Sequence, residues 1–113
     1  MADLGTLQPS LIPWAKWIYA VGKQHSGRLV VTSARRSFAK QAQLYYRWKK
    51  GLSDIPAAPP GLSLHQTGWA FDLAQMGVDP LGDPLLAYLG HWWEYYGGKW
   101  GGERDPVHFQ PRM

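Results

Sequence analysis

The sequence predicts an α+β domain in which about three helices flank a small antiparallel sheet. Three segments carry apolar residues at helical spacing, and they do not alternate strictly with strands. The strand-like segments are short and fall mostly in the later part of the chain. This grouping is typical of α+β domains rather than of parallel α/β sheets. With 113 residues, the chain is expected to form one domain, residues 1–113.

The helices are expected at residues 10–23, 37–50 and 83–96. Ser37 is a suitable N-cap for the second helix, and proline directly after Asp83 is typical of a helix start. Glycines follow the second and third segments and can end them. The apolar stripes comprise Trp14, Trp17, Ile18 and Val21 in the first segment, Phe38, Ala42, Tyr45 and Trp48 in the second, and Leu85, Leu89, Trp92, Trp93 and Tyr96 in the third.

The strands are expected between these helices and at the C-terminal end. Residues 28–32 form a β-branched run typical of a strand. Residues 52–62 contain three prolines and are expected to form a loop that borders the functional site. Residues 63–75 have the period of a strand pair broken at Gly68, and the tail is expected to end in a short strand at residues 108–110.

Composition limits the kind of site and partner. The chain has no cysteine, so any metal site must use imidazole and carboxylate ligands. The net charge of +4 favours anionic partners, but the cations are scattered rather than aligned, which argues against a nucleic-acid binder. No apolar stretch approaches the ~20 residues that span a bilayer, so we expect no membrane insertion. The N-terminus shows no basic segment followed by an apolar run, so we expect synthesis in the cytoplasm without a signal peptide.

Four residues could build a catalytic metal site: His65, Asp72, Asp105 and His108. A catalytic zinc ion takes three protein ligands and leaves one position open. His65 and Asp72 are an odd number of residues apart, so both can reach one ion only if the chain turns between them, which Gly68 permits. Asp105 could then accept a proton from water. A hydrogen-bonded structural His–Asp pair is the alternative interpretation of these residues.

Three segments carry motifs at defined spacing. They are Thr32-Ser-Ala-Arg-Arg36-Ser37 with Gln41 and Leu44-Tyr45; Ser63-Leu-His65-Gln-Thr-Gly68-Trp-Ala70-Phe-Asp72; and Trp100-Gly-Gly-Glu-Arg-Asp105-Pro-Val-His108-Phe-Gln110. They resemble, in the same order, three motifs of the zinc D-alanyl-D-alanine carboxypeptidase and L-alanyl-D-glutamate endopeptidase family. The family includes VanY-type enzymes and many phage endolysins, and the resemblance extends over roughly residues 30–110.

The resemblance implies a role for each matching residue. His65, Asp72 and His108 would ligate Zn2+, and Asp105 would be the catalytic base. Arg36 would face the scissile carbonyl, with both a catalytic and a substrate-binding role. Its alternatives are a surface cation or an ion pair that holds the second helix. Ser63 would contact substrate, or else its hydroxyl bonds to nearby backbone.

The implied fold is the DD-peptidase/hedgehog-like zinc peptidase fold, and the implied activity is hydrolysis of an amide bond in the peptidoglycan stem peptide. That bond is either L-Ala–D-Glu, cut by an endopeptidase, or D-Ala–D-Ala, cut by a carboxypeptidase. We expect a monomeric phage or prophage lysin that reaches the bacterial cell wall after release or on a virion. The alternative is a catalytically silent metal-binding module for wall recognition or a phage tail.

One departure from the family pattern bears on the base. Only Glu103 and Arg104 lie between Gly-Gly and the Asp-x-x-His motif, where phage members carry a longer insert. Glu103 is therefore a rival base, although Asp105 has the family's spacing of three residues before His108.

Overall fold

An antiparallel sheet of four strands forms the centre of the computed structural model, which describes residues 2–112. The strand order is β1-β2-β4-β3. The strands are β1 (Leu29–Ser33), β2 (Phe71–Gln75), β3 (Gly98–Trp100) and β4 (His108–Pro111). Every neighbouring pair is antiparallel, with β2 and β4 in the middle. The predicted α+β class, with three helices and a small antiparallel sheet, is confirmed.

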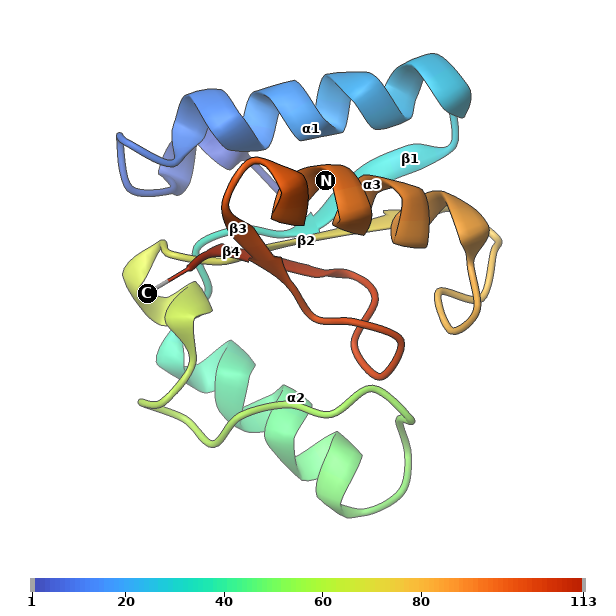
Figure 1. Ribbon diagram of the computed structural model, residues 1–113. Helices are drawn as coiled ribbons and strands as arrows, with labels where there is room; N and C mark the ends of the chain where they lie inside the picture. Colours follow the sequence, from blue (N-terminus) through green and yellow to red (C-terminus); the bar gives the residue numbers. More distant parts are fainter. Residues whose placement is uncertain (1, 113) are drawn as a thin grey trace.

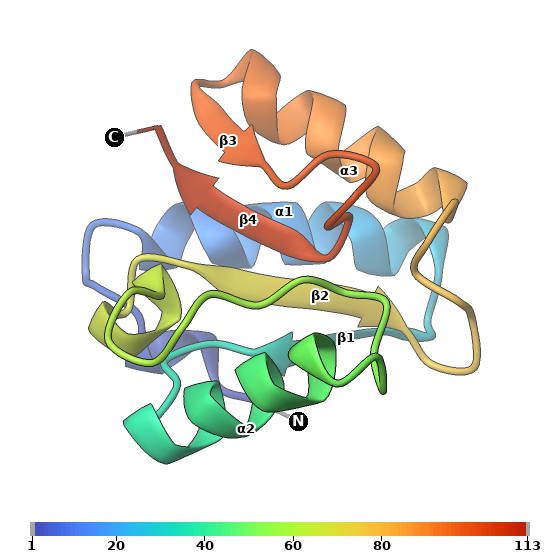
Figure 2. The same ribbon diagram turned by 90° about the horizontal axis from the view of Figure 1, so that it is seen from below.

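Helices cover the two faces of this sheet unequally. The helices α1 (Ile12–His25) and α3 (Pro84–Tyr95) lie together on one face, and α2 (Phe38–Lys49) lies on the other (Figure 1). The second view shows α2 and the loop that follows it in front of the strands (Figure 2). No helix among residues 2–112 is long and apolar enough to cross a membrane.

The hydrophobic core fills the space between the sheet and the helices α1 and α3. Leu29 and Val31 of β1, Phe71 and Leu73 of β2, and Phe109 of β4 are all buried. Their period of two places them on one face of the sheet. The helices contribute Ala15, Ile18, Leu86, Leu89 and Trp93. Because this face is apolar, the intervening strand residues, Asp72 among them, face the side where α2 lies.

The expected strand pair at residues 63–75 is wrong in its first half. Residues Leu64–Thr67 form a 3-10 helix, η2, and only Phe71–Gln75 form a strand. The Ser63 hydroxyl accepts a hydrogen bond from the His65 amide, which favours a helical turn over an extended segment. Two further elements were not expected: a 3-10 helix at Leu4–Thr6 and the short strand β3.

The expected apolar stripe of α2 also differs from the structure. Phe38 is 63% exposed, whereas Gln41, a polar residue outside the stripe, is 1% exposed. The main core cluster of the described residues contains no residue of α2. The inner face of this helix covers a polar network instead of the core, so apolar spacing was a poor guide to its orientation.

Aromatic residues assigned to the other two stripes lie partly at the surface. Trp14 of α1 is 49% exposed, and its ring lies 6.3 Å from that of Tyr96, which is also exposed. The buried positions of α1 are Ala15, Ile18 and Gly22. A small residue lies inside because Gly22 packs directly against Leu29 and Leu89, leaving no room for a Cβ atom.

Candidate metal centre

Three elements bring His65, Asp72 and His108 together. His65 lies in η2, Asp72 in β2 and His108 at the start of β4. Asp72 and His108 are directly opposite each other in the antiparallel register of β2 and β4. Side chains that are opposite in register project from the same face of a sheet. The pairing of β2 with β4 therefore places these two side chains together.

His65 reaches the same point through a sharp turn at Gly68. This glycine has φ +80° and ends η2 with its amide hydrogen-bonded to the His65 carbonyl. That backbone conformation is rarely adopted by other residues. The predicted function of Gly68, to turn the chain between His65 and Asp72, is confirmed by this geometry.

The distances among the three side chains suit a tetrahedral metal ion. His65 Nε2 lies 3.1 Å from Asp72 Oδ1, and His108 Nδ1 lies 3.6 Å from the same oxygen. The two ring nitrogens are 3.3 Å apart. Two ligands that are each about 2.1 Å from a tetrahedral zinc ion lie about 3.4 Å from each other. The observed triangle matches that spacing.

Hydrogen bonds at the far side of each ring direct the ligand nitrogen inward. His65 Nδ1 lies 3.1 Å from the Ala34 carbonyl oxygen and must donate to it, which leaves Nε2 with a free lone pair. His108 Nε2 lies 2.7 Å from Gln110 Oε1, which likewise leaves Nδ1 free. Such outer partners set the tautomer and orientation of metal-binding histidines.

A buried oxygen without a hydrogen-bond donor completes the argument for a cation. Among the described side chains, Asp72 Oδ1 is buried and accepts no hydrogen bond. Its other oxygen, Oδ2, accepts one from Arg36 at 2.9 Å. Two imidazole lone pairs and one carboxylate oxygen thus face one another, and a bound cation would satisfy all three. The residues present fit a zinc site.

The pKa shifts reflect the same crowding. Burial by itself raises the pKa of the Asp72 carboxyl, but the positive charge that His65 and His108 carry when protonated outweighs it, so this pKa lies well below its usual range. Burial lowers the pKa of His108, yet the nearby carboxylate of Asp72 raises it above the ordinary value overall.

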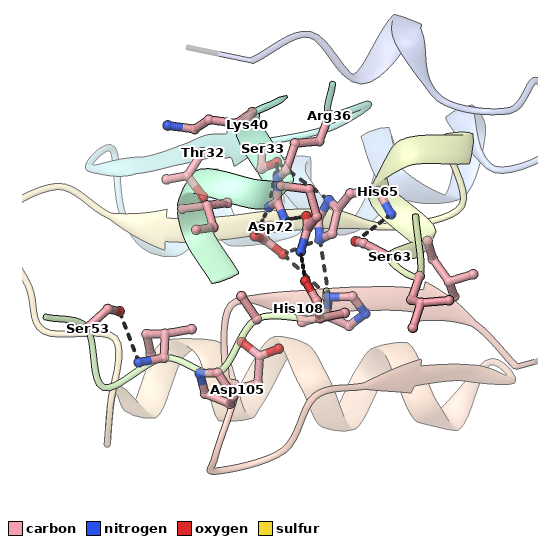
Figure 3. A pocket seen from close by; sticks show the side chains of 18 of the residues that line it. Thr32, Ser33, Arg36, Lys40, Ser53, Ser63, His65, Asp72, Asp105 and His108 are labelled. Atoms are coloured by element: carbon pink, nitrogen blue, oxygen red, sulfur yellow. Dashed lines mark hydrogen bonds and ion pairs between the residues drawn. The ribbon is translucent and has the colours of Figure 1, made fainter. Parts of the chain in front are cut away.

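Asp105 lies beside this cluster and lines the same cleft (Figure 3). The tail turns tightly here, because the His108 amide donates to the Asp105 carbonyl at 3.1 Å and Gly101 packs against Asp105 so closely that a Cβ atom would collide with it. Burial, reinforced by the negative charge of Asp72, raises the pKa of Asp105 to about 6. A carboxylate with a raised pKa is a suitable proton acceptor and donor near neutral pH. Glu103, the rival base, is exposed and does not line this cleft.

Arg36 lines the cleft and is held there by a network of hydrogen bonds. It donates to Ser33 through Nε and Nη2 at 3.0 and 2.8 Å, to Gln41 through Nη1 at 2.6 Å, and to Asp72 through Nη2. These contacts use four of the five N–H groups of its guanidinium. Arg36 therefore orients Asp72 and also lines the cleft, where one Nη1 hydrogen remains without a partner among the described residues. Ser63 likewise lines the cleft while its hydroxyl caps η2.

The cleft has a volume of about 440 Å³ and lies between α2, the loop after it, the sheet and the tail. The loop contributes Ser53, Ile55, Pro56, Ala57 and Ala58, so the expectation that residues 52–62 border the site is confirmed. The metal cluster, Arg36 and Asp105 line the same cleft (Figure 3).

The sequence model of VanY, described as D-alanyl-D-alanine carboxypeptidase, matches residues 6–85, well over half of the chain. The chain belongs to this family. The matched segment contains Arg36, His65 and Asp72 but ends before Asp105 and His108. The roles predicted for these two residues are therefore based on their own sequence motif and on the geometry of the site. A comparison with curated proteins found no match.

Solved structures with this fold include three peptidases that are named for different specificities. The vancomycin resistance D,D-dipeptidase VanXYg, in complex with a D-Ala-D-Ala phosphinate analog, has a TM-score of 0.67 and 20% identity over 93% of this chain and 50% of its own. A vancomycin resistance D,D-pentapeptidase VanY mutant in complex with Zn(II) has a TM-score of 0.66 and 18% identity over 93% of this chain and 72% of its own. The Serratia marcescens L-Ala D-Glu endopeptidase ChiX has a TM-score of 0.62 and 24% identity over 97% of this chain and 84% of its own.

These comparisons establish the fold of this VanY-family chain, which spans only half of the first structure. They also agree with the predicted zinc-peptidase fold. The D,D-dipeptidase and the L-Ala D-Glu endopeptidase show that proteins named for different bonds share this fold.

Three supporting residues received no role in the sequence interpretation: Ser33, Gln41 and Gln110. Ser33 pairs with Asp72 only because the register of β1 and β2 shifts between Val31 and Ser33. Such a bulge redirects side chains and has no sequence signature here. Gln41 could have been noticed as a polar residue between apolar positions of a helix, where burial requires partners. Its amide nitrogen donates to the Ala58 carbonyl at 2.7 Å and ties the loop to the network.

Proposed function

We propose that this chain is a zinc-dependent peptidase that hydrolyses an amide bond in the stem peptide of bacterial peptidoglycan. The observation that carries this proposal is the triangle of His65 Nε2, Asp72 Oδ1 and His108 Nδ1, whose atoms lie within 4.8 Å of one another and open on a cleft shared with Asp105. Membership of the VanY family supports a cell-wall peptide as substrate. The bond is either L-Ala–D-Glu or D-Ala–D-Ala.

Different side chains of the cleft serve different steps of the proposed reaction. A zinc ion held by His65, Asp72 and His108 would supply Lewis acidity to the scissile carbonyl and lower the pKa of water. Asp105 accepts the proton of the attacking water and returns it to the amine nitrogen as the C–N bond breaks, leaving a carboxylate and a free amine. Arg36 fixes the orientation of Asp72, and its remaining N–H can hold a carbonyl oxygen of the substrate.

A lysin acting on the cell wall is the biological setting that we propose for this activity. The net charge of +4 favours association with an anionic wall. The cleft and Asp105 favour catalysis over the alternative of a silent metal-binding module, because a purely structural metal site needs no adjacent base with a raised pKa.

Digestion of purified peptidoglycan by the zinc-loaded protein tests this function, with mass spectrometry of the products. A peptidase releases fragments that end at one stem-peptide bond, and the masses distinguish endopeptidase from carboxypeptidase cleavage. Asp105→Asn should retain zinc and lose turnover by at least ~10²-fold, the lower range for a general base. The matched control Glu103→Gln removes a carboxylate two residues away and should stay near the unmodified rate. Loss of turnover in the control alone would move the base to Glu103.

A further inference from the structure

Two cations of α2 line the cleft on which the metal cluster opens. Lys40 and Arg47 both contribute to its wall, together with Leu44 between them. Residues four and seven positions apart lie on one face of a helix. One face of α2, with Lys40 at one end and Arg47 at the other, therefore borders the cleft.

Neither cation has a polar partner among the residues that the structure describes. Among residues 2–112, all ion pairs involve Asp72, and the side chains of Lys40 and Arg47 make no ion pair or hydrogen bond. Other cations are engaged, since Lys23 donates to the Gly27 carbonyl and Arg35 to the Thr6 carbonyl. Both cleft cations are exposed, so they are free to bind an anion.

Charge is separated along this cleft. The acidic residues among its lining are Asp72 and Asp105, and both lie in or beside the metal cluster. Arg36 is neutralised by Asp72, from which it lies at 2.9 Å. The wall formed by α2 thus presents unneutralised positive charge to whatever occupies the cleft.

The length of α2 sets the distance between this charge and the reacting bond. The start of α2 is fixed beside the metal cluster, because Gln41 binds Arg36, which binds Asp72. Seven residues of helix advance about 10 Å, so Arg47 lies about 10 Å farther along the helix than Lys40. An extended peptide advances about 3.3 Å per residue and covers that length with about three residues.

We propose that Lys40 and Arg47 bind a carboxylate of the substrate peptide that lies beside Leu44, within about three residues of the scissile bond. The cleft then selects anionic peptides that continue along α2. This inference rests on the proposed peptidase function and adds the substrate charge and the direction of the bound peptide. Lys40 and Arg47 act on substrate binding, so their effect falls on KM rather than on kcat.

Paired synthetic stem peptides test the inference. The two members of a pair are identical except that one carries a free carboxylate on its acidic residue and the other a carboxamide. The zinc-loaded protein should show kcat/KM at least roughly tenfold higher for the carboxylate. Lys40→Gln and Arg47→Gln should each raise KM for the carboxylate peptide roughly three- to fivefold, as expected for solvent-accessible charge pairs, and leave the carboxamide peptide unaffected. Lys16→Gln, an equal charge change on α1 outside the cleft, is the matched control and should change neither.

Binding measurements keep this test separate from that of the proposed function. If the zinc-loaded protein cuts neither peptide, the peptidase proposal fails, and calorimetric affinities of the same pair for Asp105→Asn still decide the inference. Equal affinity for carboxylate and carboxamide, or equal loss of both in the Arg47→Gln background, overturns it. Tighter binding of the carboxylate that disappears with Arg47→Gln supports it.

Discussion

Asp105→Asn should stabilise the metal-free protein as the pH rises, although it removes the proposed base. The folded structure raises the pKa of Asp105 from 3.8 to about 6 through burial and the nearby charge of Asp72. A carboxyl whose pKa is raised on folding contributes stability that is fully present below its unfolded pKa and is lost as the pH rises through its folded pKa. Asparagine is neutral throughout, so the variant does not lose that contribution.

The size of the effect follows from the same two pKa values. A difference of about two pKa units corresponds to about 3 kcal/mol, since one unit is ~1.4 kcal/mol. Relative to the unmodified protein, Asp105→Asn should therefore gain up to about 3 kcal/mol in free energy of unfolding between pH 4 and pH 8. A constant offset from the substitution itself cancels in this comparison.

Urea denaturation of chelator-treated protein at several pH values measures this difference at fixed ionic strength. Glu103→Gln is the control, because it removes an exposed carboxylate of equal charge and should give a nearly flat difference. With zinc bound, the positive charge favours the ionised Asp105, and the pH dependence should shrink. Parallel stability curves for Asp105→Asn and the unmodified protein would refute the reasoning, since they would mean that Asp105 titrates in the folded state as it does in water.

Three further substitutions follow from the described contacts. Lysine in Arg36→Lys cannot form the planar set of hydrogen bonds that holds Asp72, so the affinity for zinc should fall about 10–100-fold in a chelator competition assay. An unchanged affinity would mean that Arg36 does not orient Asp72. Gly90→Ala places a methyl group against the Trp100 indole and should lower the free energy of unfolding by about 1–3 kcal/mol, measured by thermal denaturation. An unchanged Tm would mean that α3 packs less closely against Trp100 than described. Ile55→Ala alters the cleft wall rather than the core, so the KM for the peptide should change while Tm moves by only a few degrees. A large fall in Tm with an unchanged KM would mean that the loop serves stability rather than substrate binding.

Short-range signals in the sequence determined much of this protein. The Asp83 side chain accepts a hydrogen bond from the Leu85 amide at the start of α3, and Ser37 does the same for Lys40 in α2, as their residue types predict. The absence of cysteine restricts any metal ligands to imidazole and carboxylate, and the resemblance to the family motifs predicts His65, Asp72 and His108 as the ligands. The helix caps are confirmed because each depends on neighbours a few positions away, and the structure brings the three predicted ligands together.

Tertiary structure alone decided how those residues meet. The register that places Asp72 opposite His108, and the shift that brings Ser33 to the same point, depend on strands far apart in the chain. The orientation of α2 was misjudged because apolar spacing cannot show that Gln41 faces a buried network while Phe38 faces solvent. Arg36 was expected at the substrate, and only the structure shows that it also donates to Asp72, with its other hydrogen bonds going to Ser33 and Gln41. These contacts are set by the pairing of segments that are far apart in the sequence. The free energy that favours one pairing comes from many residues together, and no short sequence pattern contains them all.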